Sequence, residues 1–292
     1  MRARLVKALL RFFALLPLPA NHALGAFIGW LAWVLPTPAK RITRINLDLC
    51  LPELSPAERR RLARRSLMEA GKTLTETGPL WYWPAERIRA LLVGTHGAEA
   101  VDRALAAGYG AIVATPHLGS WEMAGHFGAM RWNITVLYRP PRLQALEQVM
   151  RTGRATLGAR LARTDAAGIR TLYAELRAGR LVGILPDQDP GERGGVFAPF
   201  FGVEANSMVL LPRLARKSGA PVFFAVCERL PRGRGYRLHF TPAPGGITDP
   251  DPRTAATAMN QGVEACVRAL PEQYQWNYRR FRTRPPGEPP LY

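Results

Sequence analysis

Between residues 91 and 241 the sequence alternates short apolar segments with longer amphipathic ones, and this alternation constrains the fold more than any other feature. The clearest apolar segments, at 111–115, 134–138 and 181–185, each end at a proline or at an arginine followed by prolines. Further strands are expected at 91–93, 221–228 and 235–241, and helices at 98–108, 120–130, 143–162, 166–178, 207–218 and about 252–270, after two helices within 41–77. The pattern predicts an α/β fold with a mostly parallel sheet covered by helices.

The first 40 residues have a different character. Residues 12–35 contain no charged side chain, and basic residues flank them on both sides. This length is enough to cross about 30 Å of hydrocarbon, although Pro17 and Pro19 interrupt the run. We expect a short basic helix before Pro17 and an apolar helix from about 21 to 35 that crosses or lies in a membrane, with a cleaved signal peptide as the alternative. The chain therefore divides into a membrane-binding or transmembrane segment, 1–40, and a catalytic domain, 41–292.

The charge of the chain indicates an anionic partner. Forty basic residues against 22 acidic ones give a net charge of +18, and all but four of the basic residues are arginines. Arginine binds phosphate and carboxylate groups in a bidentate manner, so nucleic acid, an anionic membrane surface and an acidic carrier protein are all candidates. Nucleic acid is disfavoured because the aromatic residues do not alternate with the basic ones as a stacking platform requires. Cys50, Cys227 and Cys266 form no CxxC pair and no zinc spacing, which suits buried thiols in a reducing compartment.

Polar side chains follow each of the three clearest strands. Because ligands in open α/β sheets bind beyond the carboxyl ends of the strands, these side chains are expected to form one site. Between the second and third strands lies an arginine-rich region, 139–180, that suits a phosphorylated or carboxylated substrate. The substrate-binding candidates are Arg139, Arg151, Arg154, Asp187 and Gln188.

His117 and Glu122 are the catalytic candidates. A histidine and a carboxylate just past a strand end can act as a base and its orienting partner, which together deprotonate a hydroxyl. Gly119 permits a turn after His117, and Ser120 as N-cap would place Glu122 in the first turn of the following helix, from where its carboxylate could reach back to the imidazole. A metal site made of His117, Glu122 and His126 is the alternative, but no HExxH motif is present, and neither a metal nor another cofactor is expected.

An ordered set of motifs along almost the whole chain resembles the late acyltransferases of lipid A biosynthesis, the lauroyl/myristoyl transferases within the lysophospholipid (glycerolipid) acyltransferase superfamily. The motifs are Arg44-Ile-Asn46-Leu47, Leu51-Pro52-Glu53, Glu76-Thr77-Gly78, His117-Leu-Gly-Ser-Trp-Glu122, Leu137-Tyr138-Arg139-Pro140, Pro186-Asp187-Gln188-Asp189, Val196-Phe-Ala-Pro-Phe-Phe-Gly202 and Trp276 to Pro285. One departure is Ser207, where the resemblance leads us to expect threonine.

The resemblance implies an enzyme on the cytoplasmic face of the bacterial inner membrane. It would transfer an acyl chain from acyl carrier protein to a hydroxyl of a lipid A precursor of the Kdo-lipid IVA type, by direct attack of the deprotonated hydroxyl on the thioester. Another membrane glycolipid or a lysophospholipid is the alternative acceptor, and coenzyme A the alternative donor carrier. The apolar segment 196–202 would either pack in the core or line a slot for the acyl chain.

Overall fold

The computed structural model describes residues 2–141, 144–191 and 194–292. The helices are α1 (Arg2–Leu15), α2 (Leu18–Val34), α3 (Pro38–Cys50), α4 (Pro56–Tyr82), α5 (Ala85–Arg89), α6 (Ala98–Ala106), α7 (Trp121–Trp132), α8 (Glu147–Ala155), α9 (Ala166–Arg177), α10 (Leu210–Ser218) and α11 (Pro252–Ala269). The strands are β1 (Leu92–His96), β2 (Ala111–Ala114), β3 (Thr135–Tyr138), β4 (Arg160–Arg163), β5 (Leu181–Ile184), β6 (Gly195–Phe200), β7 (Val203–Met208), β8 (Val222–Arg229) and β9 (Tyr236–Pro242).

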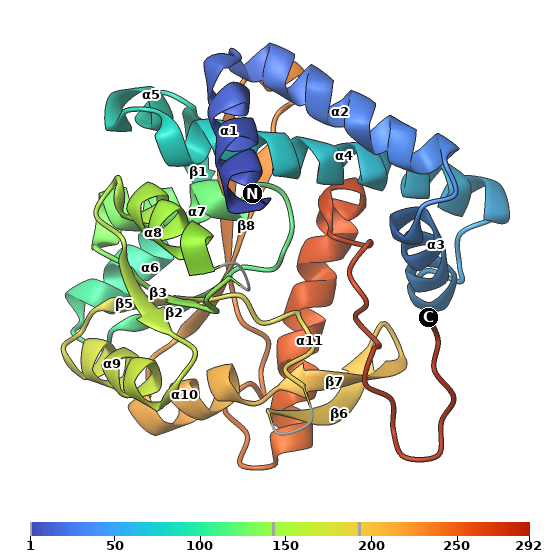
Figure 1. The fold of residues 1–292 in the computed structure, drawn as a ribbon. Coiled ribbons are helices and arrows are strands. Elements are labelled where there is room, and N and C mark those ends of the chain that lie inside the picture. The colour runs from blue at the N-terminus through green and yellow to red at the C-terminus, as the bar shows by residue number, and fades with distance from the viewer. Residues whose placement is uncertain (1, 142–143, 192–193) are drawn as a thin grey trace.

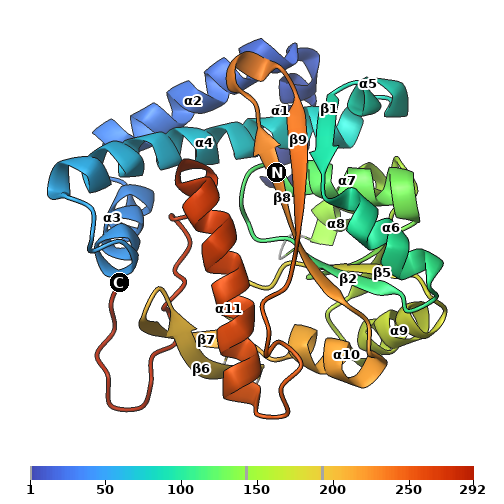
Figure 2. The ribbon, with the colours of Figure 1, turned by 180° about the vertical axis from the view of Figure 1, so that it is seen from behind.

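A seven-stranded sheet forms the centre of the molecule, with the order β1-β9-β8-β2-β5-β3-β4 (Figures 1 and 2). Neighbouring strands pair in parallel, except that β8 and β9 are antiparallel. The prediction of an α/β fold with a mostly parallel sheet is confirmed. The three clearest predicted strands are also parallel neighbours, with β5 between β2 and β3.

Alternating side chains of the strands enter two cores on opposite faces of the sheet. In β2, Ile112 and Ala114 belong to the core covered by α9, α10 and α11, whereas Ala111 and Val113 belong to the core covered by α6 and α7. Successive side chains of a strand point to opposite faces, so β2 must be apolar throughout to be buried on both. This explains why the buried strands are continuous apolar runs.

Two stretches of the sequence form strands that the pattern did not predict. The expected helix 143–162 is wrong at its C-terminal end, because α8 stops at Ala155. Gly158 then adopts a left-handed conformation (φ 94°), and the following strand β4 pairs with β3. Residues 142–143 lie outside the described part of the chain. The segment 196–202 forms most of β6 and the turn of an antiparallel hairpin with β7. Because β7 extends to Met208, the helix expected at 207–218 begins only at Leu210.

The N-terminal helices pack closely on α4. As predicted, one helix ends before Pro17 and a second follows it. Helix α4 is capped by Ser55, which forms a reciprocal pair of hydrogen bonds with Glu58. Helices α2 and α4 approach backbone to backbone, because a Cβ atom on Gly29 would lie 2.0 Å from the carbonyl oxygen of Leu67. Glycine is therefore needed at this crossing.

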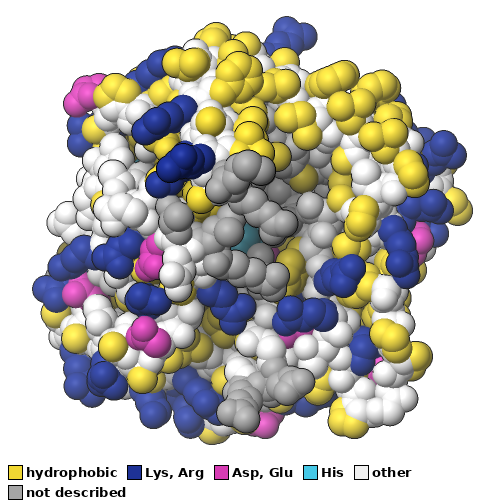
Figure 3. Space-filling view, in the orientation of Figure 1, with side chains coloured by type: hydrophobic (Ala, Val, Ile, Leu, Met, Phe, Trp, Pro, Cys, Tyr) yellow, Lys and Arg dark blue, Asp and Glu magenta, His cyan; other side chains and the backbone are white. Residues whose placement is uncertain are grey.

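The outer surface of α1 and α2 exposes large apolar side chains (Figure 3). They include Leu5, Phe12, Leu15, Phe27 and Trp30, each at least 42 % exposed. Within the described chain no single helix combines the length and the apolar character needed to cross a bilayer; α2 and α3 meet those criteria only together, and they are bent by 80° at the break between them. The predicted membrane helix is thus unconfirmed.

Candidate active site

The ends of β2 and β5 bring His117 and Asp187 together. The two strands pair in parallel with Ala114 opposite Ile184, and each functional residue lies three positions beyond that pair. The imidazole Nδ1 of His117 lies 2.8 Å from Oδ1 of Asp187, and the backbone N–H of His117 donates to Oδ2 at 3.0 Å. One carboxylate therefore fixes both the backbone and the ring of His117.

This arrangement leaves the other ring nitrogen of His117 available as a base. Burial by itself raises the pKa of the Asp187 carboxyl, but the neighbouring His117 and its hydrogen bonds lower that pKa overall, so the carboxylate is ionised. An ionised carboxylate only accepts hydrogen bonds, so Nδ1 carries a proton, and in the neutral imidazole the lone pair lies on Nε2. Trp121 packs edge-on against the imidazole, with ring centroids 5.0 Å apart, and His117 lines a cavity.

Glu122 does not orient His117, and this expectation from the sequence is wrong. Its carboxylate accepts hydrogen bonds from Nε1 of Trp81 at 2.9 Å and from Nε and Nη2 of Arg154 at 3.0 and 2.5 Å. Burial raises the pKa of the Glu122 carboxyl, but the charge of Arg154 lowers it overall. Glu122 and Arg154 are thus a partly buried ion pair in the cavity wall.

The turn after His117 explains this difference. Gly119 adopts a left-handed conformation (φ 62°), and α7 begins at Trp121 with Ser120 in the N-cap position, although the Ser120 side chain makes no capping hydrogen bond. Glu122 then lies in the first turn of α7 and bonds to α4 and α8 instead of to the imidazole. A signal in the sequence could have identified the true partner, since Pro116 and Pro186 precede His117 and Asp187 at the same distance from their strands.

The cavity beside His117 has a volume of about 560 Å³. Apolar side chains make up much of its wall: Val136, Leu137, Met150, Leu161, Ile169, Ile184, Leu185, Met208, Val209 and Leu210. Two aromatic residues of 196–202, Phe200 and Phe201, instead pack in the core, where they are buried against Trp276 and its neighbours. The apolar wall that could hold a hydrocarbon chain therefore comes from the sheet, α8, α9 and the start of α10.

The structure places most of the predicted substrate-binding residues at this cavity. Arg139, Arg154 and Gln188 line it, and the amide of Gln188 contacts Gln275 at 3.4 Å. Arg151 instead donates from Nη1 to the hydroxyl of Tyr138 at 3.1 Å and is half-exposed.

Sequence reasoning missed Arg213 among the residues that line the cavity. It is exposed on α10, a helix that the pattern predicted without indicating which of its side chains face the site.

Asp187 was predicted as a substrate-binding residue, but both of its carboxylate oxygens are occupied by hydrogen bonds with His117.

The described residues contain no cluster of three histidine, cysteine or acidic side chains that could hold a metal ion. His126, the third member of the metal site considered above, is buried and contacts the carbonyl oxygen of Leu80 at 2.9 Å. Burial lowers the pKa of His126, in keeping with a neutral structural histidine. The three cysteines are buried free thiols, as predicted.

Several remaining motifs stabilise the C-terminal segment. The Asn46 amide donates to the carbonyl oxygens of Trp276 and Tyr278, both at 2.7 Å. Arg280 donates to the Ser207 hydroxyl at 2.8 Å. Threonine would supply the same hydroxyl, so the departure at Ser207 preserves this contact.

Similarity to known proteins extends along almost the whole chain. Residues 2–283 match the family model described as bacterial lipid A biosynthesis acyltransferase. The chain is 35 % identical over 281 residues to the lipid A biosynthesis palmitoleoyltransferase of Escherichia coli K12, which covers 95 % of this chain and 90 % of the relative. It is 36 % identical over 279 residues to the lipid A biosynthesis lauroyltransferase of the same organism, with the same coverage. The E. coli myristoyltransferase of the pathway is 28 % identical over 276 residues, or 92 % of this chain and 82 % of the relative.

Proposed function

Because the chain belongs to the bacterial lipid A biosynthesis acyltransferase family, we propose that it transfers a fatty acyl chain from acyl carrier protein to a hydroxyl of a Kdo-lipid IVA-type precursor, with His117 as the base. The observation that carries this proposal is the His117–Asp187 pair at the edge of a cavity with an apolar wall. The pair supplies the base, and the wall suits a hydrocarbon chain.

In the proposed reaction, Nε2 of His117 takes the proton of the acceptor hydroxyl. The alkoxide oxygen attacks the thioester carbon, the bond between carbon and sulfur breaks, and the carrier thiolate leaves and takes up a proton. Asp187 stabilises the imidazolium ion that forms and keeps the ring in the productive tautomer. Because the base acts on the acceptor itself, no acyl-enzyme intermediate is needed.

Arg154 provides positive charge beside the reacting atoms. Its side chain lines the cavity and is held by Glu122, so the guanidinium is fixed before the substrate binds. Burial lowers the pKa of Arg154, but Glu122 raises it overall, and the group stays charged. A fixed cation, together with the backbone N–H groups at the start of α7, can stabilise the oxyanion of the tetrahedral intermediate.

The charge and the apolar surface support the proposed partners and location. Arg139 and Arg213 at the cavity suit the phosphates of the acceptor or the acidic surface of a carrier protein. The apolar side chains exposed on α1 and α2 suit contact with a bilayer. We therefore place the enzyme at the cytoplasmic face of the inner membrane, where both substrates would be accessible.

A transfer assay tests the proposal. Purified enzyme is incubated with lauroyl-, myristoyl- or palmitoyl-carrier protein and a tetraacylated precursor that carries Kdo, and the mass of the product is measured by mass spectrometry. We expect a gain of one acyl unit, and a loss of about 10²- to 10⁴-fold in turnover in His117→Ala with binding retained. Near wild-type turnover in this variant would refute the role of His117 as the base, and absence of transfer from every donor would refute this acceptor and donor pair.

A further inference from the structure

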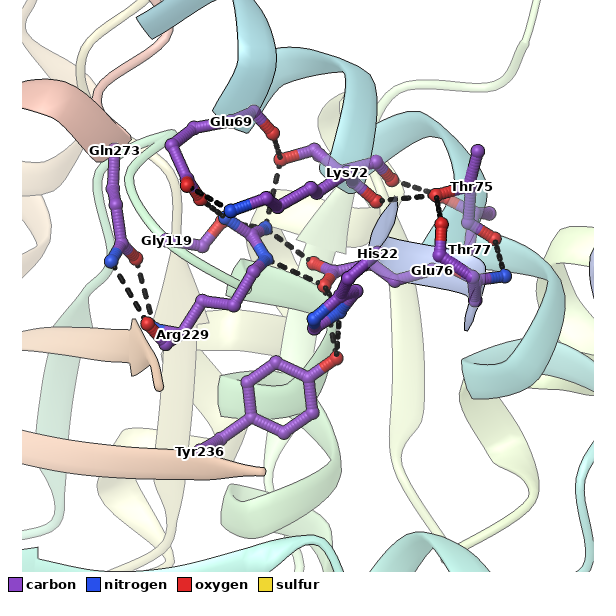
Figure 4. A network of polar contacts seen from close by, with 12 residues as sticks. His22, Glu69, Lys72, Thr75, Glu76, Thr77, Gly119, Arg229, Tyr236 and Gln273 are labelled. Atoms are coloured by element: carbon purple, nitrogen blue, oxygen red, sulfur yellow. Dashed lines mark hydrogen bonds and ion pairs between the residues drawn. The ribbon is translucent and has the colours of Figure 1, made fainter. Parts of the chain in front are cut away.

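A buried cluster of charged residues lies next to Gly119, in the turn that follows His117 (Figure 4). This turn, residues 117–120, is called the catalytic turn below. Its centre is Arg229, the last residue of β8, whose side chain is 1 % exposed. Nε and Nη2 of Arg229 donate to the two carboxylate oxygens of Glu76 at 2.8 and 2.6 Å, and Nη1 donates to Glu69 at 2.7 Å. A buried guanidinium with two carboxylate partners is strongly localised, because moving it would leave buried charges unpaired.

The Glu76 carboxylate is fixed by three different parts of the chain. Besides Arg229, it accepts a hydrogen bond from the Tyr236 hydroxyl at 2.9 Å and contacts Nε2 of His22, in α2, at 3.2 Å. Burial raises the pKa of Glu76, but the charge of Arg229 lowers it overall, so the carboxylate is ionised. Helix α2, helix α4 and the sheet therefore meet at one ion pair.

The same guanidinium also reaches the catalytic turn. Nη2 of Arg229 donates to the carbonyl oxygen of Gly119 at 3.2 Å, two residues after His117. The N–H of Gly119 donates to the backbone carbonyl of Gln273 at 3.0 Å, and the side chain of Gln273 bonds to both the N–H and the carbonyl of Arg229. Both polar groups of Gly119 are thus bound to Arg229 or to its direct partner.

The turn has little room to shift. A Cβ atom on Gly119 would lie 1.9 Å from the carbonyl oxygen of Cys227, and the N–H of Ser120 donates to that same oxygen at 2.8 Å. The position of the turn therefore depends on the end of β8, and His117 must meet Asp187, which lies on a different strand. Since hydrogen bonds are directional, a shift of the turn would weaken the contact between His117 and Asp187.

We infer that Arg229 is a positioning residue for the reaction: by holding the carbonyl of Gly119, its guanidinium keeps His117 aligned with Asp187. This inference rests on the proposed role of His117 as the base. Arg229 lies behind the turn and acts on the reaction only through that turn. Its removal should therefore lower turnover more than it changes substrate binding.

The test compares Arg229→Lys with Tyr236→Phe. Lysine keeps the positive charge beside Glu76, but a single ammonium group lacks the planar geometry that binds Glu76, Glu69 and Gly119 together. Tyr236→Phe is the matched control, because it removes a hydrogen bond to the same buried carboxylate without touching the turn. Each variant is assayed for kcat and KM, for thermal unfolding, and for the His117 ring resonance in protein labelled with ¹⁵N-histidine, assigned with His117→Ala.

For Arg229→Lys we expect a roughly tenfold to hundredfold loss of kcat with KM changed much less, as is typical of a misplaced catalytic group. The His117 resonance should shift, while those of His96 and His239 stay in place. Tyr236→Phe should lower the unfolding temperature yet retain wild-type kcat and the wild-type His117 resonance.

An unchanged His117 resonance in Arg229→Lys, or an equal shift in Tyr236→Phe, would overturn the inference. If Arg229→Lys does not fold, the double variant Glu76→Gln with Arg229→Gln removes the ion pair as a unit and should shift the same resonance. If His117→Ala is instead fully active, the proposed function fails, but the resonance still tests whether Arg229 positions His117.

Discussion

Asp187→Asn is the sharpest test of the site, because it changes one atom of the group that orients His117. In the structure both oxygens of Asp187 accept N–H groups, one from the backbone and one from the ring of His117. Asparagine has a single oxygen to offer. The backbone N–H can only donate, so the asparagine oxygen will face it and the amide NH₂ will face Nδ1.

This exchange reverses the tautomer of the imidazole. With a donor opposite it, Nδ1 must become the acceptor, so the proton moves to Nε2, where the proposed base needs its lone pair. We expect kcat to fall by about 10²- to 10⁴-fold, the range for losing a general base or its correct tautomer. Because the side chain keeps its shape and two hydrogen bonds, the free energy of unfolding should fall by only about 1 to 2 kcal/mol.

Glu122→Gln is the matched comparison. Its carboxylate accepts three N–H donors, two from Arg154 and one from Trp81, and an amide cannot satisfy all of them. The Arg154 side chain is 24 % exposed, so water offsets part of the loss, and we expect about 1 to 3 kcal/mol of destabilisation. Steady-state acyl transfer and urea unfolding are measured on both variants. Near wild-type kcat in folded Asp187→Asn would refute the reasoning. A loss of kcat in Glu122→Gln alone would not, because Glu122 also holds Arg154 at the cavity.

Two further predictions concern the cavity and the acid sensitivity of the fold. Met208 lines the apolar wall, so Met208→Trp should shift the preferred donor to a shorter acyl chain. The expected loss is about 0.8 kcal/mol of binding free energy for each methylene that no longer fits, and competition between donors of different length measures it. An unchanged preference would mean that the acyl chain binds elsewhere. The pKa values of the Glu76, Glu122 and Asp187 carboxyls are lowered in the folded protein. The stability that these carboxylates contribute is therefore fully present above the ordinary carboxyl pKa of about 4, and it is lost as the pH falls through the lowered values. The urea midpoint should therefore drop steeply below about pH 4, and a midpoint that stays flat down to pH 3 would contradict these lowered values.

The sequence by itself determined the class of fold and singled out the candidate base. Strands β2 and β5 are buried on both faces and are therefore continuous apolar runs. Helices α8 and α9 between them are amphipathic, so these elements could be located from local pattern. His117 could be found because it lies three residues beyond the end of such a strand. Strands β4 and β7 were missed because short strands with polar residues differ little from helix or loop in pattern alone. Strand β6 was missed although it is apolar, because Pro199 interrupts its run and Gly202 follows it.

The tertiary structure alone decided which groups meet. Asp187 lies 70 residues from His117 in sequence, and the two come together because β5 inserts between β2 and β3 with Ala114 opposite Ile184. Glu122, only five residues away, turns instead toward Arg154, and the cluster around Arg229 joins residues from α2, α4 and β8. Local sequence sets which residues are polar and which element carries them, but strand order and register set the distances between them, and hydrogen bonds form only at short range.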